Sequence, residues 1–242
     1  MHMENATSLI PFIDLTSLNT QDDYTSITAL IQKANKGFHK LYPAAVCTYP
    51  KYTHQLEALR PEIKKCVVST YFPSSQAPLQ LKLQEIDFLN QTNIDEIDIV
   101  LSVGEFLSGN HLEVSQELLA IRKKTTKTIK LILETGILDS KKNIQLAAQI
   151  GMDTGMDFLK TSTGKTPIGA TINAVSYLAE TISKTQSKTI GLKIAGGIRT
   201  PQQAISFITA IEKYLGPAFT HPATFRIGAS SLYDTLIHPN ND

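Results

Sequence analysis

Residues 128–162 read TIKLILETGILDSKKNIQLAAQIGMDTGMDFLKTS, and this stretch decides the fold class. It starts with an apolar run at Thr128–Glu134, has apolar residues three and four apart over Ile144–Ile150, and ends in a second apolar run at Phe158–Ser162. This order predicts a strand, a helix and another strand. Because Ile129–Leu133 holds a single polar residue, it is too apolar for a sheet with one face in water, and we expect parallel strands with helical crossovers.

The same pattern extends in both directions along the chain. Six more apolar runs have the length and composition of strands, and they are Leu9–Leu15, Ala44–Thr48, Cys66–Phe72, Ile97–Ser102, Ile190–Ile194 and Phe225–Ala229. Helical spacing of apolar residues recurs between them, at Ile27–Asn35, Leu79–Leu89, Val114–Lys123, Ile172–Ile182 and Ala204–Tyr214. Eight strand–helix units in 242 residues predict an α/β protein that folds as one (β/α)8 TIM barrel.

The alternative architecture is an open, doubly wound sheet. Such a sheet usually carries a Gly-x-Gly-x-x-Gly turn for a dinucleotide, and the sequence contains none. No linker, charge run or low-complexity tract divides the chain, and its most loop-like stretches are Tyr71–Pro78 and Gly216–Ala223. We therefore expect a single barrel domain over residues 1–242.

Composition and charge narrow the classes of partner. Lys plus Arg number 23 and Asp plus Glu number 22, so the formal charge is +1 and no cationic surplus is present for nucleic acid. No apolar run reaches the length of a membrane span, and Met1–Leu9 lacks the pattern of a signal peptide. Two cysteines do not make a disulfide framework, so we expect a cytoplasmic protein. From the charge balance and the short apolar runs, we expect it to bind neither nucleic acid nor membrane.

Four charged residues interrupt the predicted strands. Asp98 lies in EIDIV at 96–100, and Lys130, Lys160 and Lys193 lie in the next three strands. Each interval between them matches one strand–helix unit, so all four can project from neighbouring strands into one interior. Because the active site of a barrel is built where its strands end, these residues are candidates for chemistry.

A lysine on a strand is usually a solvated surface residue or one half of a buried ion pair, and that interpretation suffices for any one of these lysines alone. Three lysines at matching positions favour another one. A buried amine beside a second cation loses proton affinity, because burial and like-charge repulsion both disfavour its charged form. A neutral amine attacks a carbonyl, so the pattern predicts Schiff-base chemistry.

Small residues follow the last two predicted strands, in AGGIRT at 195–200 and in GASSL at 228–232. They let main-chain N–H groups approach an anion closely, and barrels commonly hold a phosphate in the loops after strands seven and eight. Either turn alone is an ordinary glycine-containing loop. Together they predict a phosphate site.

Three other features of the sequence are weaker evidence of function. TGKT at 163–166 looks like the end of a P-loop, but the first glycine of that motif would stand at position 159, which is Leu159. The six histidines show no His-Glu-x-x-His spacing, so no metal site is expected. Cys47 lies near the end of the second predicted strand, where it lines the pocket or, more simply, packs as a small apolar group.

Six segments together resemble deoxyribose-phosphate aldolases. In chain order they are FIDLTSLN at 12–19, AAVCTYP at 44–50, EIDIV at 96–100, KTSTGK at 160–165, KIAGGIRT at 193–200 and RIGASS at 226–231. The resemblance covers the chain from its first predicted strand to its eighth, and KTSTGK and KIAGGIRT are specific signatures. It implies a class I aldolase, a carbon–carbon lyase that reversibly cleaves 2-deoxy-D-ribose 5-phosphate to acetaldehyde and D-glyceraldehyde 3-phosphate in deoxyribose phosphate catabolism.

The resemblance also implies roles for individual residues. Lys160 is the expected Schiff-base nucleophile, Lys193 the cation that keeps it neutral, and Asp98 the proton relay. The expected supporting network is Lys130, Asp14, Thr16 and Cys47. The expected contacts to substrate and phosphate are Thr163, Lys165, Gly196, Gly197, Gly228, Ser230 and Ser231. No metal or organic cofactor is implied.

Two other functions stay open. A Schiff-base aldolase for another phosphorylated sugar would keep Lys160 and the phosphate loops and change the contacts near Asp14, Thr16 and Cys47. A non-catalytic barrel that only binds a sugar phosphate would gain nothing from a desolvated lysine pair, which weighs against it. A soluble enzyme of this size is commonly a homodimer, which we expect here.

Overall fold

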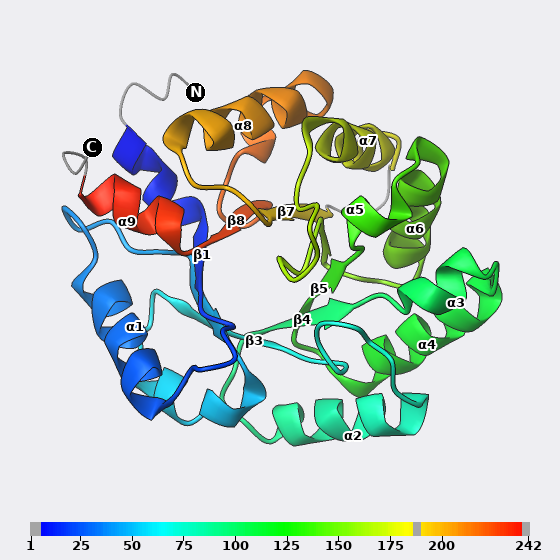
Figure 1. Cartoon of the computed structure of the whole chain (residues 1–242), viewed down its shortest axis with the longest axis horizontal. Coiled ribbons are helices and arrows are strands. Elements are labelled where there is room, and N and C mark those ends of the chain that lie inside the picture. The colour runs from blue at the N-terminus through cyan, green and yellow to red at the C-terminus, as the bar shows by residue number, and fades with distance from the viewer. Residues whose placement is uncertain (1–5, 186–189, 239–242) are drawn as a thin grey trace.

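The computed structural model describes residues 6–185 and 190–238, in which eight parallel strands close into a barrel inside a ring of helices (Figure 1). Each strand pairs with the next one along the chain, and the eighth pairs with the first. The strands are β1 (Ile13–Thr16), β2 (Ala45–Thr48), β3 (Lys64–Val68), β4 (Glu96–Val100), β5 (Thr128–Ile132), β6 (Phe158–Lys160), β7 (Gly191–Ala195) and β8 (Phe225–Ala229). The predicted TIM barrel is confirmed, and the open sheet is wrong.

Helices follow the strands in alternation, and between β2 and β3 these are only the short 3-10 helices η2 (Pro50–Tyr52) and η3 (Gln55–Ala58). The α-helices in the described residues are α1 (Tyr24–Lys36), α2 (Leu79–Asn90), α3 (Val103–Leu107), α4 (His111–Lys124), α5 (Thr135–Leu138), α6 (Lys141–Asp153), α7 (Ile172–Ser183), α8 (Pro201–Leu215) and α9 (Ser231–Ile237). The six predicted helical segments lie within α1, α2, α4, α6, α7 and α8 and are confirmed. The shorter helices α3, α5 and α9 were not predicted, because they are too brief for a helical spacing of apolar residues to show.

The start of α8 illustrates how the sequence places a helix. Thr200 Oγ1 accepts a hydrogen bond from the N–H of Gln203, and Gln203 Oε1 accepts one from the N–H of Thr200 in return. Pro201 takes the first helical position, where its missing N–H needs no partner. This capping box fixes the helix directly after the 195–200 turn, in which phosphate contacts are expected.

The first predicted strand, Leu9–Leu15, is wrong in its first half. Residues Ala6–Phe12 form a 3-10 helix, η1, and β1 starts only at Ile13. Pro11 lies inside that helix and has no N–H to give to a strand ladder. Leu9, Ile10 and Phe12 of η1 are nonetheless buried, and η1 packs against β8 and α9. The run is apolar because it belongs to the core, although it is not a strand.

Several predicted strands extend too far at their carboxyl ends. The runs Cys66–Phe72 and Thr128–Glu134 leave the sheet before they end. Thr70 and Tyr71 have φ of 57° and 58°, and Glu134 has φ of 55°. That left-handed region is incompatible with a strand, so the chain turns there into the loops that surround the barrel mouth. Apolar composition alone could not show these turns.

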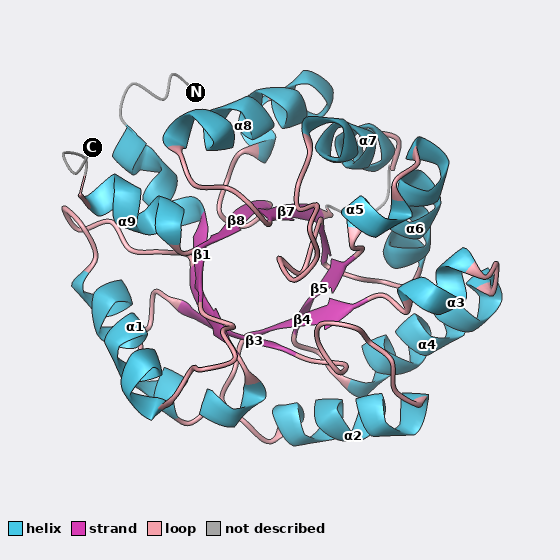
Figure 2. Cartoon of the chain, viewed as in Figure 1, coloured by secondary structure: helices cyan, strands magenta, loops and turns pink. Residues whose placement is uncertain are grey.

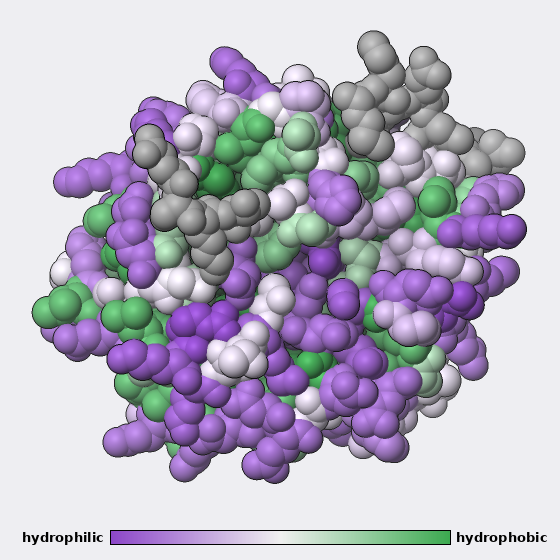
Figure 3. Space-filling view, turned by 180° about the vertical axis from the view of Figure 1, so that it is seen from behind, coloured by the Kyte–Doolittle hydropathy of each residue, from purple (hydrophilic) through white to green (hydrophobic). Residues whose placement is uncertain are grey.

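Figure 2 shows the strands enclosed by helices, and Figure 1 looks at the carboxyl ends of the strands, where loops such as the one from β7 to α8 lie in front. On the opposite face, hydrophilic residues cover most of the lower half and hydrophobic residues form separate small groups (Figure 3). Within residues 6–185 and 190–238, no helix combines the length and the apolar character needed to cross a bilayer. In a TIM barrel, the face seen in Figure 1 is the one that carries the active site.

Candidate active site

Every strand of the barrel contributes an ionisable side chain to the buried interior. These residues are Asp14 (β1), Cys47 (β2), Cys66 (β3), Glu96 and Asp98 (β4), Lys130 (β5), Lys160 (β6), Lys193 (β7) and Arg226 (β8), and none is more than 6% exposed. Successive side chains of a strand point to opposite faces, so an interior charge alternates with apolar residues that face the helices. This alternation explains how a strand as apolar as β5 still places a lysine inside.

Asp98 lies at the centre of this group. Its Oδ2 accepts hydrogen bonds from the Nζ of Lys160 at 2.8 Å and of Lys193 at 2.7 Å, and its Oδ1 accepts one from the Nζ of Lys130 at 2.9 Å. Lys160 and Lys193 are register partners on β6 and β7, as Asp98 and Lys130 are on β4 and β5. The predicted grouping of one carboxylate and three amines is present, and the alternative of solvated surface lysines is wrong.

Asp14 and Glu96 add two carboxylates to the network, and Arg226 joins them. Asp14 lies 2.6 Å from the Nζ of Lys193 and 2.8 Å from a guanidinium nitrogen of Arg226. Glu96 lies 2.6 Å from the Nζ of Lys130 and 3.0 Å from another nitrogen of Arg226. Arg226 therefore holds both carboxylates at the end of the network remote from Lys160.

The sequence analysis missed Glu96 and Arg226. A signal was available, because each lies two residues before a predicted interior residue on its own strand, Asp98 and Gly228. An even separation on one strand places both side chains on the same face. The sequence analysis considered charged residues near the ends of strands, whereas both missed residues lie near the beginnings of their strands.

The ion pairs keep most members of the network charged. Burial alone would raise the pKa of Asp14 and Asp98, but the surrounding lysines hold both pKa values below their ordinary range. Burial alone would lower the pKa of Lys130 and Lys193, but neighbouring carboxylates raise both. Lys193 is therefore a cation beside Lys160, as its expected role requires.

Lys160 differs from the other two interior lysines in its surroundings. Lys130 lies within ion-pair distance of three carboxylates and Lys193 of two, whereas Lys160 pairs with Asp98 alone among the described residues. Lys160 also lines an open cavity, and the other two do not. Because an amine that attacks a carbonyl must reach its substrate, Lys160 is the candidate nucleophile.

The cavity measures about 220 Å³ and opens at the carboxyl ends of the strands. The predicted site residues that line it are Thr16, Lys160, Thr163, Lys165, Gly196, Gly197, Gly228, Ser230 and Ser231. The predicted residues that do not line it are Asp14, Cys47, Asp98, Lys130 and Lys193, all of which are fully buried. The cavity lining also includes residues that the sequence analysis did not name as site residues, and they are Leu18, Gly164, Ala195, Ile198, Arg199 and Ala229.

The turn after β7 offers main-chain donors to this cavity. Gly196 and Gly197 have φ of 92° and 83°, a region that glycine adopts without steric cost. In the part of the chain that the structure describes, the N–H groups of Gly197 and Ile198 donate to no protein acceptor. Two unpaired N–H groups at a cavity wall favour an anionic ligand. The predicted phosphate loop after strand seven thus has the donors it needs.

The loop of residues 163–170 extends over the barrel opening, where Figure 1 shows it in yellow-green. The carboxylate of Glu134 anchors it and accepts hydrogen bonds from the N–H of Thr163 at 3.3 Å, from the Thr163 hydroxyl, and from the Thr166 hydroxyl at 3.1 Å. The Nζ of Lys165 donates to the main-chain oxygen of Leu18. Glu134, which the sequence analysis did not single out, therefore positions the predicted contacts Thr163 and Lys165.

Gly169 packs this loop closely against the turn after β7, and we expect Gly169→Ala to weaken anion binding. A Cβ at Gly169 would lie 2.3 Å from the main-chain oxygen of Gly196, which is closer than the atoms can approach. The turn must move, and a displacement near 1 Å in a binding site costs about tenfold to a hundredfold. Calorimetric titration with inorganic phosphate measures the loss.

Gly104→Ala is the matched control for Gly169→Ala. Gly104 lies in α3, and a Cβ there would meet no atom within 4 Å. We expect this control to bind phosphate as the unchanged protein does. Equal phosphate affinity in the two variants would show that the contact between the 163–170 loop and Gly196 does not shape the anion site.

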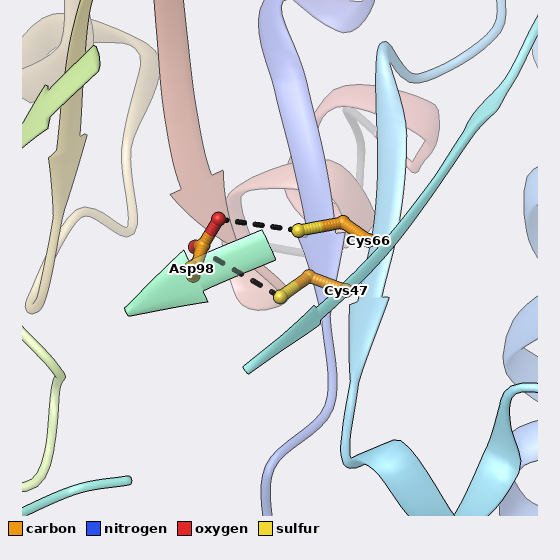
Figure 4. Close-up of side chains that lie close together, drawn as sticks. All are labelled: Cys47, Cys66 and Asp98. Atoms are coloured by element: carbon orange, nitrogen blue, oxygen red, sulfur yellow. Dashed lines mark hydrogen bonds between the residues drawn. The ribbon is translucent and has the colours of Figure 1, made fainter. Parts of the chain in front are cut away.

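Two thiols and a carboxylate form the one cluster in the described residues with the composition of a metal site. The ligand atoms of Cys47, Cys66 and Asp98 lie within 4.8 Å of one another (Figure 4). The Asp98 oxygens, however, already accept hydrogen bonds from three lysines, and Lys130 Nζ lies 3.2 Å from Cys66 Sγ. A divalent cation would meet these ammonium groups at close range, so we assign the cluster to the lysine network.

Comparison with known families gives an independent view of this chain. The sequence model described as DeoC/LacD family aldolase matches residues 8–235. The curated deoxyribose-phosphate aldolase of Agrobacterium fabrum is 32% identical over 239 residues, which are 97% of this chain and 91% of that protein.

Solved structures show the same architecture. A deoxyribose phosphate aldolase from Aeropyrum pernix, described as having a unique tetrameric structure, is 26% identical with a TM-score of 0.74, and the match covers 98% of this chain and 93% of that chain. A protein from Coccidioides immitis superimposes with a TM-score of 0.84 over 97% of this chain and 87% of that chain. At 24% identity, this second likeness shows the fold alone.

Proposed function

The chain belongs to the DeoC/LacD family of aldolases, and from this premise we propose that it reversibly cleaves 2-deoxy-D-ribose 5-phosphate to acetaldehyde and D-glyceraldehyde 3-phosphate through a Schiff base on Lys160. The observation that carries the proposal is the position of Lys160. It lines the cavity, and its Nζ shares one oxygen of Asp98 with the Nζ of Lys193. An amine, a cation and a carboxylate are thereby gathered at one point, as Schiff-base chemistry requires.

The proposed reaction begins when the Lys160 amine attacks the aldehyde carbon, C1, of the open-chain sugar and expels water. The resulting iminium withdraws electrons, so removal of the C3 hydroxyl proton breaks the C2–C3 bond and releases D-glyceraldehyde 3-phosphate. The enamine that remains takes a proton at C2, and water then hydrolyses the iminium to acetaldehyde and free Lys160. The steps balance with proton transfers alone, so we propose that no metal or organic cofactor takes part.

Asp98 is the proposed proton relay for these transfers. Its carboxylate lies 2.8 Å from the Nζ of Lys160, within hydrogen-bond reach of the reacting nitrogen. Lys193 donates to the same oxygen and holds the carboxylate in place. The two side chains can therefore pass a proton to or from a substrate atom, or a water, held above Lys160.

The phosphate group is proposed to occupy the side of the cavity formed by the ends of β7 and β8. Gly197 and Ile198 offer N–H groups, and Ser230 and Ser231 offer hydroxyls. Lys165 and Arg199 add positive charge to the lining of the same cavity. A dianion at this position is held by neutral donors and by flanking cations, which suits a sugar phosphate.

The test of the proposed function is reductive trapping followed by product analysis. The purified protein is incubated with acetaldehyde and borohydride, and peptides are examined by mass spectrometry. We expect an ethyl group on Lys160, and we expect acetaldehyde and D-glyceraldehyde 3-phosphate from 2-deoxy-D-ribose 5-phosphate. Trapping that is absent, or scattered over surface lysines, would exclude the aldolase mechanism.

Ser231→Asp is expected to remove the preference for a phosphorylated substrate. Ser231 is exposed in the cavity wall at the start of α9, so a carboxylate there would repel the phosphate at close range. We expect the ratio of kcat/KM for 2-deoxyribose 5-phosphate over 2-deoxyribose to fall at least about tenfold, since a change in one charged contact is worth a few kcal/mol. Ser183→Asp, at an exposed position in α7, is the matched control. An unchanged ratio in Ser231→Asp would place the phosphate elsewhere.

The two alternative functions predict different results in the same assays. A Schiff-base aldolase for another phosphorylated sugar would still be trapped on Lys160, but a screen of donor aldehydes would yield other products. A barrel that only binds sugar phosphate would bind without turnover. The cytoplasmic location, the homodimer and the domain bounds 1–242 stay predictions, and those bounds include residues outside the described ranges.

A further inference from the structure

The buried network contains one more cation than carboxylate. The cationic side chains are Lys130, Lys160, Lys193 and Arg226, and the carboxylates are Asp14, Glu96 and Asp98. An uncompensated charge is costly where no member of the network is more than 6% exposed. One of the four basic groups is therefore under pressure to give up its proton.

The contacts decide which group that is. Arg226 does not deprotonate in proteins. Lys130 and Lys193 each lie within ion-pair distance of at least two carboxylates, whereas Lys160 has only Asp98, and it shares that oxygen with Lys193. Lys160 is therefore the basic group that gives up its proton most readily.

We propose that Arg226 and Glu96 are positioning residues that set the charge state of Lys160 without touching it, because they fix the balance of charges in the barrel interior. The inference deepens the proposed function and rests on it, since it concerns the same Schiff base. Neither residue lines the cavity described for the substrate. Their effect has to pass through the ion pairs between them and Lys160.

Two continuous paths of ion pairs make that connection. One path runs from Arg226 to Glu96 at 3.0 Å, on to Lys130 at 2.6 Å, and from Lys130 to Asp98 at 2.9 Å. The other leads from Arg226 through Asp14 and Lys193 to the same carboxylate, in contacts of 2.6 to 2.8 Å. Both paths end on Asp98, the carboxylate that Lys160 contacts. Because no member of the network is more than 6% exposed, charges several ångströms apart still interact strongly.

The sign of each substitution follows from the charge count. Arg226→Met leaves three lysines against three carboxylates, so a protonated Lys160 is compensated and a higher pH is needed to free the amine. Glu96→Gln leaves four cations against two carboxylates, so the amine is freed at a lower pH. The double variant restores a single excess cation and returns to the behaviour of the unchanged protein.

Two further cations, Lys165 and Arg199, face Lys160 from the cavity lining, and the other titratable groups beside Asp98 in the described interior are the thiols of Cys47 and Cys66. Cys66 Sγ lies 3.2 Å from Asp98 Oδ1, and burial raises the pKa of the Cys66 thiol, which keeps it neutral. Cys47 Sγ lies 4.0 Å from Asp98 Oδ2 and is the one other group in the described network that could release the excess proton. Cys47→Ala separates the two cases, because it removes that thiol and leaves the charge count of the lysines unchanged.

The experiment measures the pH dependence of imine formation. Each variant is incubated with acetaldehyde and cyanoborohydride between about pH 5 and pH 9, and ethylation of Lys160 is divided by ethylation of a simple amine added to the same sample, corrected for the known ionisation of that amine. This ratio cancels the pH dependence of the reagent. We expect the midpoint of the acid limb to shift to higher pH by about one unit in Arg226→Met and to lower pH by about one unit in Glu96→Gln. In the double variant, we expect the midpoint to stay in place. Arg226→Lys, which keeps the charge, should retain the position of the limb.

The outcomes separate this inference from the proposed function. If the unchanged protein is not trapped on Lys160, the proposed function fails. If trapping occurs and the limb stays in place in both single variants, or moves in the same direction in both, the inference fails. A limb that moves in Cys47→Ala assigns the excess proton to that thiol and also overturns it. Should Arg226→Met not fold, Glu96→Gln decides alone, because glutamine has nearly the same shape as the glutamate it replaces.

Discussion

Lys160→Met is expected to abolish trapping of acetaldehyde and to lower cleavage of 2-deoxy-D-ribose 5-phosphate by about 10⁴-fold or more. Methionine keeps much of the length of lysine but offers no nitrogen to form the iminium, so no electron sink exists for breaking the C2–C3 bond. Losses of this size are usual when the nucleophile of a covalent mechanism is removed. Peptide mass spectrometry after borohydride reduction measures the first effect, and an assay for released acetaldehyde measures the second.

Lys82→Met is the matched control, because Lys82 is also a buried lysine but lies outside the barrel interior. It is 1% exposed on α2, where its Nζ contacts Glu117 at 2.9 Å and the Ser102 hydroxyl at 2.7 Å. Removal of Lys82 leaves the Glu117 carboxylate without its cation, so we expect reduced thermal stability together with full trapping on Lys160. If Lys160→Met still turned over substrate while Lys82→Met did not, the nucleophile would lie outside the barrel and the assignment of the cavity would be wrong.

The fold could be predicted because strands buried on both faces leave a strong trace in sequence. Runs such as Ile129–Leu133 recur once per unit, and eight units close a barrel. The same trace fails at Leu9–Leu15, because a 3-10 helix that covers the core is as apolar as a strand. It also fails at residues such as Glu134, whose left-handed backbone ends a strand although the neighbouring residues are apolar. Hydrophobicity reports burial, and backbone conformation must be known separately.

The candidate site could be predicted in part for a related reason. Asp98, Lys130, Lys160 and Lys193 are anomalies inside apolar strands, and equal spacing along the chain becomes proximity once the barrel closes. The count of charges could not be predicted. Glu96 and Arg226 belong to the same interior, but which of the charged residues near strand starts turn inward depends on register, and a register error of one residue reverses the face.

Asp98→Asn is expected to separate imine formation from proton transfer, and this is the second large effect. Acetaldehyde bound to Lys160 as an iminium exchanges its methyl hydrogens with solvent each time the enamine forms and is protonated again. We expect this exchange, followed by NMR in heavy water, to fall about 10²-fold to 10⁴-fold, the usual contribution of a general acid–base group. Trapping on Lys160 should persist, because loss of a negative charge from the network disfavours the protonated form of its lysines.

Glu117→Gln supplies the comparison for Asp98→Asn, since it also removes a carboxylate that contacts a buried lysine, in this case Lys82. We expect its exchange rate to match that of the unchanged protein, because Glu117 lies on α4, outside the barrel interior. Trapping on Lys160 and hydrogen exchange together then show at which step Asp98 acts. If exchange survived Asp98→Asn, another group such as Lys193 would carry the proton, because Lys193 and Lys160 donate to the same oxygen of Asp98. If trapping and exchange were lost together in a folded protein, Asp98 would act in forming the iminium and would not be confined to relaying protons after it.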